Sequence, residues 1–162
     1  MKNKKSLFIT QAAVIAAIYV VLTVAISAFD LASGAIQVRI SEALTVLPYF
    51  TPAAIPGLFA GCLISNTVTG CLPWDIVFGS IATLIGAIGT YSLRKVKWLA
   101  PVPPILANSI IVPFVLQYVY EFEGSYWYFM ATVGAGEIIS CGILGMLLLF
   151  ALNKYKNVIF RQ

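Results

Sequence analysis

The chain has 162 residues, of which 60% are hydrophobic and only 10% are charged, and its mean hydropathy is +0.95. A soluble domain carries about 25% charged residues, so these side chains cannot cover a water-facing surface of this size. The length suits a single domain over residues 1–162. The basic residues cluster beside apolar runs and form no stripe interleaved with aromatic residues, which excludes a nucleic-acid partner and indicates an integral membrane protein.

The first apolar run, Leu7–Phe29, follows three lysines. It exceeds the roughly 7–15 residues of a signal-peptide core and is long enough to cross about 30 Å of hydrocarbon. We therefore expect a spanning helix here. The other clear spanning candidates are Trp74–Leu93, Pro103–Tyr120 and Tyr126–Leu152.

The region Ser41–Leu72 is harder to assign, because it contains three prolines that interrupt helices. We expect a short helix Ser41–Phe50, a break at Thr51 and Pro52, and another helix Ala53–Leu72. At about 1.5 Å per residue the short helix cannot span the bilayer. Such a segment often borders a binding cavity, although tilting or local thinning of the bilayer would also accommodate it.

The basic residues set the expected topology. They cluster at the amino end, between residues 94 and 97, and at the carboxyl end, and basic segments favour the cytoplasmic side. Six crossings place all three clusters on that side, so we predict an all-α membrane protein with six transmembrane helices in one compact bundle and both termini inside. Five acids then fall near external helix ends: Asp30, Glu42, Asp75, Glu121 and Glu123. Arg39 is the one basic residue outside.

Alanines in the first helix form two rows at a spacing of four residues: Ala12 with Ala16, and Ala13 with Ala17. Small residues at this spacing lie on one helix face and let another helix approach closely. The rows predict either a docking face for a partner subunit or ordinary packing inside the bundle.

Two features point to a binding site. Arg39 and Glu42 bring opposite charges to the external mouth, where they can pair with each other or face a ligand. Glu137 lies near the middle of the last helix, where a charged side chain costs about 2.5–3.5 kcal/mol on insertion scales. Such a residue normally faces a polar cavity, so Glu137 can bind a ligand, carry a proton, or remain a satisfied internal carboxyl group.

Further polar or aromatic residues in or beside the helices are Asn66, Asp75, Asn108 and Trp74. Carboxylates accept from ring N–H groups, amides donate or accept, and an indole stacks on a flat ring. The combination suits a flat polar heterocycle. Trp74 can equally be an anchor at the membrane interface.

Other chemistry is excluded. The chain has no Walker A or glycine-rich nucleotide motif, so it cannot hydrolyse ATP, and no Ser/His/Asp set, so we expect no enzyme. The three cysteines, Cys62, Cys71 and Cys141, have no CxxC spacing, and histidine is absent. We therefore expect neither a metal nor a cofactor.

A resemblance to a known family rests on the middle third of the chain. The run from Gln37 to Cys62, which begins Gln-Val-Arg-Ile-Ser-Glu, and the run from Trp74 to Ser80, Trp-Asp-Ile-Val-Phe-Gly-Ser, resemble the QueT family. QueT proteins are substrate-binding (S) components of energy-coupling factor transporters in bacterial plasma membranes. They are associated with queuosine precursors, which are 7-deazaguanines.

The resemblance implies a mechanism. The S component captures substrate outside, docks on a coupling transmembrane subunit driven by two ATPases, and topples to release substrate inside. The family's alanine-rich docking face on helix 1 implies that role for Ala12, Ala13, Ala16 and Ala17. The alternative is a self-sufficient carrier in which Glu137 relays protons.

A deazaguanine presents N1–H and its 2-amino group side by side. We expect Glu137 or Glu42 to accept both, in a charge-assisted pairing. Arg39 or an asparagine would donate to O6. Asp75 would bind the cation if the substrate carries an aminomethyl group.

Overall fold

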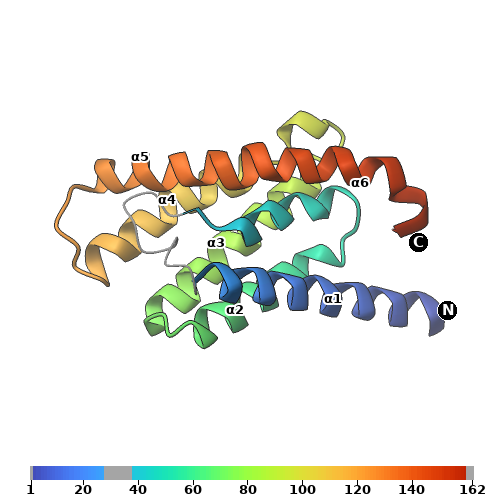
Figure 1. Ribbon diagram of the computed structural model, residues 1–162, viewed down its shortest axis with the longest axis horizontal. Helices are drawn as coiled ribbons and strands as arrows, with labels where there is room; N and C mark the ends of the chain where they lie inside the picture. Colours follow the sequence, from blue (N-terminus) through green and yellow to red (C-terminus); the bar gives the residue numbers. More distant parts are fainter. Residues whose placement is uncertain (1, 28–37, 160–162) are drawn as a thin grey trace.

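The computed structural model describes residues 2–27 and 38–159 of the chain (Figure 1). The expected end of the first helix at Phe29, and the residues Asp30, Gln37 and Arg161, lie outside these ranges. Every described element is helical. The α-helices are α1 (Lys2–Ser27), α2 (Ala54–Val68), α3 (Pro73–Ser92), α4 (Val102–Tyr118), α5 (Tyr126–Glu137) and α6 (Met146–Ile159). Three further helices of different pitch are η1 (Ile40–Tyr49), η2 (Lys97–Leu99) and η3 (Ile138–Gly145).

The last three helices form one continuous rod. A π-helical segment, η3, joins α5 to α6 without a break, so the rod runs from Tyr126 to Ile159 and extends past the expected end at Leu152 (Figure 1). Counted this way, the described part of the chain contains six helical rods besides the short turn η2.

A short second helix is present, but it is a 3-10 helix. η1 has ten residues and contains Pro48, and the chain breaks before α2 begins at Ala54. At about 2.0 Å per residue, η1 is about 20 Å long, well short of the roughly 30 Å of a hydrocarbon core. Its residues from Ser41 to Pro48 are all buried, so η1 is an internal element of the bundle.

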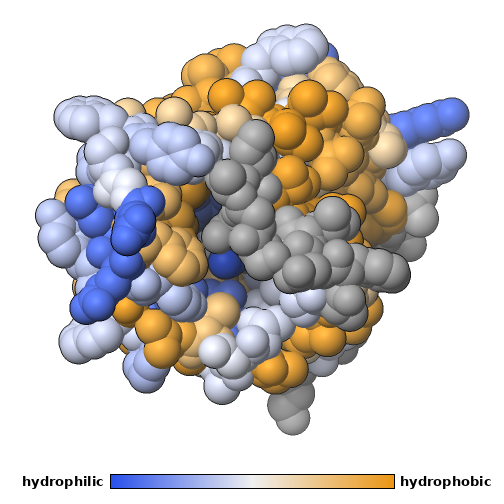
Figure 2. All heavy atoms as spheres, turned by 60° about the vertical axis from the view of Figure 1, so that its left-hand side comes forward, coloured by the Kyte–Doolittle hydropathy of each residue, from blue (hydrophilic) through white to orange (hydrophobic). Residues whose placement is uncertain are grey.

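Four segments are long and apolar enough to cross a membrane: Lys4–Ser27, Pro73–Ser92, Lys97–Tyr118 and Tyr126–Lys156. The helix α2 is apolar but has only 15 residues. Many large apolar side chains are exposed, above all along α1, and apolar surface covers much of the face in Figure 2. Such a surface is stable in lipid and would associate in water.

The contact between α1 and α2 depends on glycine. A Cβ atom at Gly57 would lie 2.7 Å from the Ala12 carbonyl oxygen, and one at Gly61 would lie 2.8 Å from Tyr19 Cβ. The glycines therefore allow the α2 backbone to pack directly on the row formed by Ala12 and Ala16. The motif follows the small-residue rule for helices packed in membranes.

The described basic clusters gather at one end of the molecule. The amino end of α1 and the carboxyl end of α6 lie at the same end (Figure 1). The connection between α3 and α4 joins them, because the Trp98 ring packs on Phe150 of α6 at 5.3 Å and Lys97 Nζ lies 5.3 Å from the Phe150 ring centroid. The candidate site lies away from this basic end.

Candidate functional site

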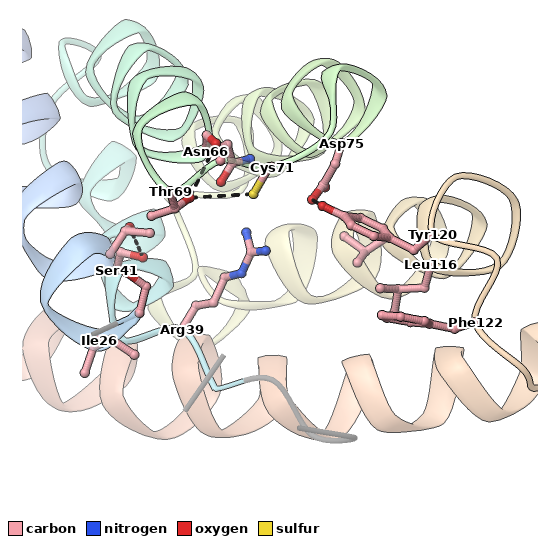
Figure 3. A pocket seen from close by; sticks show the side chains of 14 residues that line it. Ile26, Arg39, Ser41, Asn66, Thr69, Cys71, Asp75, Leu116, Tyr120 and Phe122 are labelled. Atoms are coloured by element: carbon pink, nitrogen blue, oxygen red, sulfur yellow. Dashed lines mark hydrogen bonds between the residues drawn. The ribbon is translucent and has the colours of Figure 1, made fainter. Parts of the chain in front are cut away.

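A cavity of about 360 Å³ opens among α1, η1, the α2–α3 connection and the carboxyl end of α4. Figure 2 shows hydrophilic side chains at the bottom of a hollow in this face, and Figure 3 shows its walls. The lining residues are Thr23, Ile26, Ser27, Arg39, Ser41, Asn66, Thr69, Gly70, Cys71, Asp75, Val112, Leu116, Tyr120 and Phe122. With polar groups on one side and aromatic rings on the other, the cavity has the size and lining of a small-molecule site.

A small recess of about 20 Å³ lies beside this cavity. The two spaces share Arg39, Asp75 and Val112 as walls. The recess is also lined by Glu42, Gly79, Thr83, Asn108, Val133 and Glu137. A space of this size holds about one water molecule, so a heterocycle fits the cavity, and only a small group fits the recess.

Glu42 reaches the recess from the buried helix η1 and is only 2% exposed. The Tyr19 hydroxyl of α1 donates to Glu42 Oε1. Among the described residues, Glu42 Oε2 has no hydrogen-bond partner. A buried acceptor without a partner is costly, and here Glu42 lines a space that shares three wall residues with the larger cavity.

Glu137 faces Glu42 from the point where α5 becomes π-helical. The Cys141 thiol, one turn later, donates to Glu137 Oε2 at 3.1 Å and also lies 3.4 Å from the Glu42 carbonyl oxygen. Gly145 permits this approach, because a Cβ atom there would lie 2.9 Å from Val46 Cγ1 of η1. Segments of π-helix are rare and often mark functional sites, and this one positions Glu137 beside Glu42.

Asp75 lies in the first turn of α3 and is 6% exposed. The helix dipole favours a carboxylate at this position. The Tyr120 hydroxyl donates to Asp75 Oδ2 at 2.9 Å and accepts from the Leu72 amide at 3.3 Å. Burial raises the pKa of Tyr120, and the Asp75 carboxylate raises it further, so the phenol remains a donor.

The remaining polar groups complete the two spaces. The Arg39 guanidinium points into the cavity (Figure 3), and within the described ranges it has no carboxylate oxygen within 4.0 Å. Of the two alternatives for Arg39 and Glu42, the ion pair between them is thus not formed. Asn66 lines the cavity, and its Nδ2 lies 3.7 Å from Cys62 Sγ. Asn108 lines the recess within interaction range of both glutamates.

Two sets of predicted residues lie elsewhere. The Trp74 side chain is 61% exposed and stacks on Phe78 at 6.0 Å, outside both spaces. The alanines divide: Ala12 and Ala16 are half-buried against α2, whereas Ala13 and Ala17 are exposed. Six of the seven predicted ligand residues therefore come together, and one alanine row remains available on the surface.

A metal ion would find three ligand atoms beside the recess. Oxygens of Glu42 and Glu137 and the Cys141 sulfur all lie within 4.8 Å of one another. Structural zinc sites have four protein ligands, and the thiol here donates its hydrogen to Glu137. The geometry is as compatible with a small organic cation as with a metal ion.

Several site residues were missed from sequence. Tyr19 sits in an apolar helix where a tyrosine is usually a packing or interface residue, and Tyr120 was taken only as a helix end. For Cys141 the sequence predicts no role beyond the absence of a metal site. One signal was available, because Cys141 follows Glu137 by four residues and residues at that spacing share a helix face.

Comparisons with known proteins identify the family of the chain. The model of the family described as "QueT transporter" matches residues 9–154. A curated relative, "Queuosine precursor transporter QueT" of Lactococcus lactis subsp. cremoris (strain MG1363), is 35% identical over 86 residues, which are 52% of this chain. The alignment spans about half of the relative's length, 50%. No solved structure matches the chain. Since the family model covers most of the sequence, this multi-pass helical chain belongs to the QueT transporter family.

Proposed function

We propose that this chain is the substrate-binding subunit of an energy-coupling factor importer and that its cargo is a queuosine precursor of the 7-deazaguanine type. The observation that carries the proposal is the cavity of about 360 Å³ lined by Arg39 and Asp75, together with the adjoining recess lined by Glu42 and Glu137. Membership of the QueT transporter family supports a transport role, and the name of the Lactococcus relative supports the cargo.

The chemistry of the cavity matches such a heterocycle. A 7-deazaguanine carries several N–H donors and one carbonyl acceptor. The carboxyl groups of Glu42, Asp75 and Glu137 offer acceptors, and the Arg39 guanidinium offers donors. Tyr120 and Phe122, whose rings stack at 5.6 Å, add aromatic surface at the mouth. The ring would therefore bind in the cavity with its polar edges toward charged groups.

The orientation follows from the charges. With the basic end in the cytoplasm, the cavity opens on the external side, as capture of a nutrient requires. The chain then crosses the membrane six times if η1 counts as an inward crossing and α2 as the outward crossing that follows it. Cys71 at the cavity mouth is partly exposed, whereas Cys62 and Cys141 are buried. We expect a membrane-impermeant maleimide to label Cys71 from outside intact cells. In a Cys71→Ser background, the same reagent should label Lys95→Cys only after the cells are permeabilised. The reverse pattern would show that the topology is inverted.

Docking on a coupling subunit would use the exposed row formed by Ala13 and Ala17 on α1. The proposed docking face is thus narrower than the four alanines of the sequence pattern, because Ala12 and Ala16 pack on α2. Replacing Ala13 by tryptophan would prevent close approach of a partner helix. We expect that variant to keep ligand affinity and to lose coupled uptake.

The binding step is tested by titrating 7-deazaguanines into the purified protein and its Glu137→Gln variant. Loss of a hydrogen bond to a charged group predicts affinity at least about tenfold weaker in the variant, whereas unchanged affinity removes Glu137 from the site.

Reconstitution in liposomes tests the coupling. Uptake only with the ATPases and coupling subunit supports the proposal, and uptake by the chain alone under a proton gradient would establish the carrier alternative.

A further inference from the structure

The side chains that line the recess beside the cavity are not accounted for by binding of a heterocyclic ring. It holds about 20 Å³, close to the space that one water molecule needs. The carboxyl groups of Glu42 and Glu137 border it, and Glu42 is 2% and Glu137 7% exposed. An aromatic ring cannot enter, so the recess takes either solvent or a small substituent of the cargo.

The charges favour a cationic substituent. Among the described residues, the walls of the cavity and recess carry the carboxyl groups of Glu42, Asp75 and Glu137 and one basic group, the guanidinium of Arg39. One oxygen of each carboxyl group lies within 4.8 Å of the other, so the negative charge of one disfavours ionisation of the other, and a cation between them would favour the ionised form of both. A shared proton can serve when the recess is empty, and a positive group on the ligand would replace it.

The hydrogen-bond acceptors favour an ammonium group in particular. Glu42 Oε1 already accepts from Tyr19, whereas Glu42 Oε2 has no partner among the residues described. Glu137 offers further acceptor capacity, and the Asn108 carboxamide lies beside both. A primary ammonium has three N–H donors, which the carboxylate oxygens of Glu42 and Glu137 can accept. It is also about the size of the water molecule that the recess would hold.

We propose that the recess is a subsite for a primary ammonium group of the cargo, bound between Glu42 and Glu137 while the ring remains in the larger cavity. The inference rests on the proposed function and reverses the assignment expected from sequence. Asp75, at the junction of the two spaces, then faces the N–H edge of the ring, and the glutamates bind the cation. In the 7-deazaguanine class, the cargo is therefore one with an aminomethyl substituent.

Three ligands titrated into the purified full-length protein in nanodiscs test this assignment. They are 7-aminomethyl-7-deazaguanine, its neutral 7-hydroxymethyl counterpart, and a 7-dimethylaminomethyl derivative that keeps the charge but exceeds the recess. We expect the aminomethyl ligand to bind at least about tenfold more tightly than either of the others, the effect of a charge-assisted hydrogen bond. Equal binding of all three would overturn the subsite while leaving the proposed function intact, and binding of none would overturn the proposed function.

Two variants of the protein test which carboxyl group binds the ammonium group of the ligand. In Glu137→Gln the preference for aminomethyl over hydroxymethyl should shrink to within about threefold, and binding of the hydroxymethyl ligand reports that the variant is folded. In Asp75→Asn both ligands should weaken by a similar factor, so the preference persists. Loss of the preference in Asp75→Asn with retention in Glu137→Gln would place the ammonium at Asp75 and contradict the proposal. If Glu137→Gln does not fold, the ligand series on the unmodified protein decides.

Discussion

The cavity around Arg39 and the apolar groove between α1 and α6 are both large, but they differ in chemistry. The groove holds about 710 Å³, twice the cavity, and its walls are almost entirely aliphatic, from residues such as Val14, Leu44 and Leu148. The cavity is smaller and is lined by charged, amide and hydroxyl groups. In a protein whose solvent is lipid, an apolar hollow is compatible with hydrocarbon and needs no ligand. The polar hollow is therefore the candidate site, because buried charge is costly in a membrane protein.

The largest expected effect comes from filling each hollow in turn. Cys71→Trp places an indole in the polar cavity from a loop position. We expect it to weaken binding of a 7-deazaguanine by at least about a hundredfold, which corresponds to about 2.8 kcal/mol, as measured by calorimetric titration.

Thr10→Trp is the matched control, because Thr10 lines the apolar groove. It adds the same indole and should leave affinity within about twofold. If Thr10→Trp abolished binding and Cys71→Trp did not, the roles of the two hollows would be exchanged.

A smaller effect tests the division of the alanine rows on α1. Gly57→Ala introduces a Cβ atom 2.7 Å from the Ala12 carbonyl oxygen, and the backbone must move to accept it. Overpacking of this kind costs about 1–3 kcal/mol, so we expect a lower midpoint of thermal unfolding in detergent. Ala13→Leu on the exposed row should change stability by less than about 0.5 kcal/mol. Equal destabilisation by both would mean that Ala13 also packs inside the bundle.

The smallest effect concerns one hydroxyl group at the cavity mouth. Tyr120→Phe removes the donor to Asp75 Oδ2, and a hydrogen bond of this kind contributes about 0.5–1.5 kcal/mol. We expect ligand affinity to fall by roughly two- to tenfold.

The pH dependence follows from the sign of the Tyr120 shift. Since the pKa of Tyr120 is raised above its ordinary 10.0, the neutral phenol persists at higher pH, and raising the pH to about 10 should not remove its contribution. Wild-type affinity that converged on that of Tyr120→Phe between about pH 9 and 10 would contradict this.

Much of the fold could be predicted from apolar runs. The expected helix Trp74–Leu93 corresponds to α3, Pro73–Ser92, because a run of that length and composition favours a helix wherever it packs. The pitch of η1 and η3 could not be predicted. It depends on how the two segments meet, with Gly145 against Val46, and no local pattern encodes a contact across about 100 residues.

The residues of the candidate site that could be predicted from sequence are those whose charge falls within an apolar helix. Glu137 stood out because it interrupts an apolar helix, and it lines the recess. Tyr19 did not stand out, because its hydroxyl becomes informative only once Glu42 is seen to accept from it. Trp74 shows the opposite case. An indole near a helix end suits either a binding site or the membrane interface, and only the fold places it on the outer surface.

The central claim is that the charged cavity, and not the larger apolar groove, binds the cargo. A structure of the protein determined with a bound 7-deazaguanine tests this most directly. We expect ligand density within the cavity, in contact with Arg39 and Asp75. Density for the heterocycle in the groove lined by Val14, Leu44 and Leu148, with the cavity unchanged, would contradict the account.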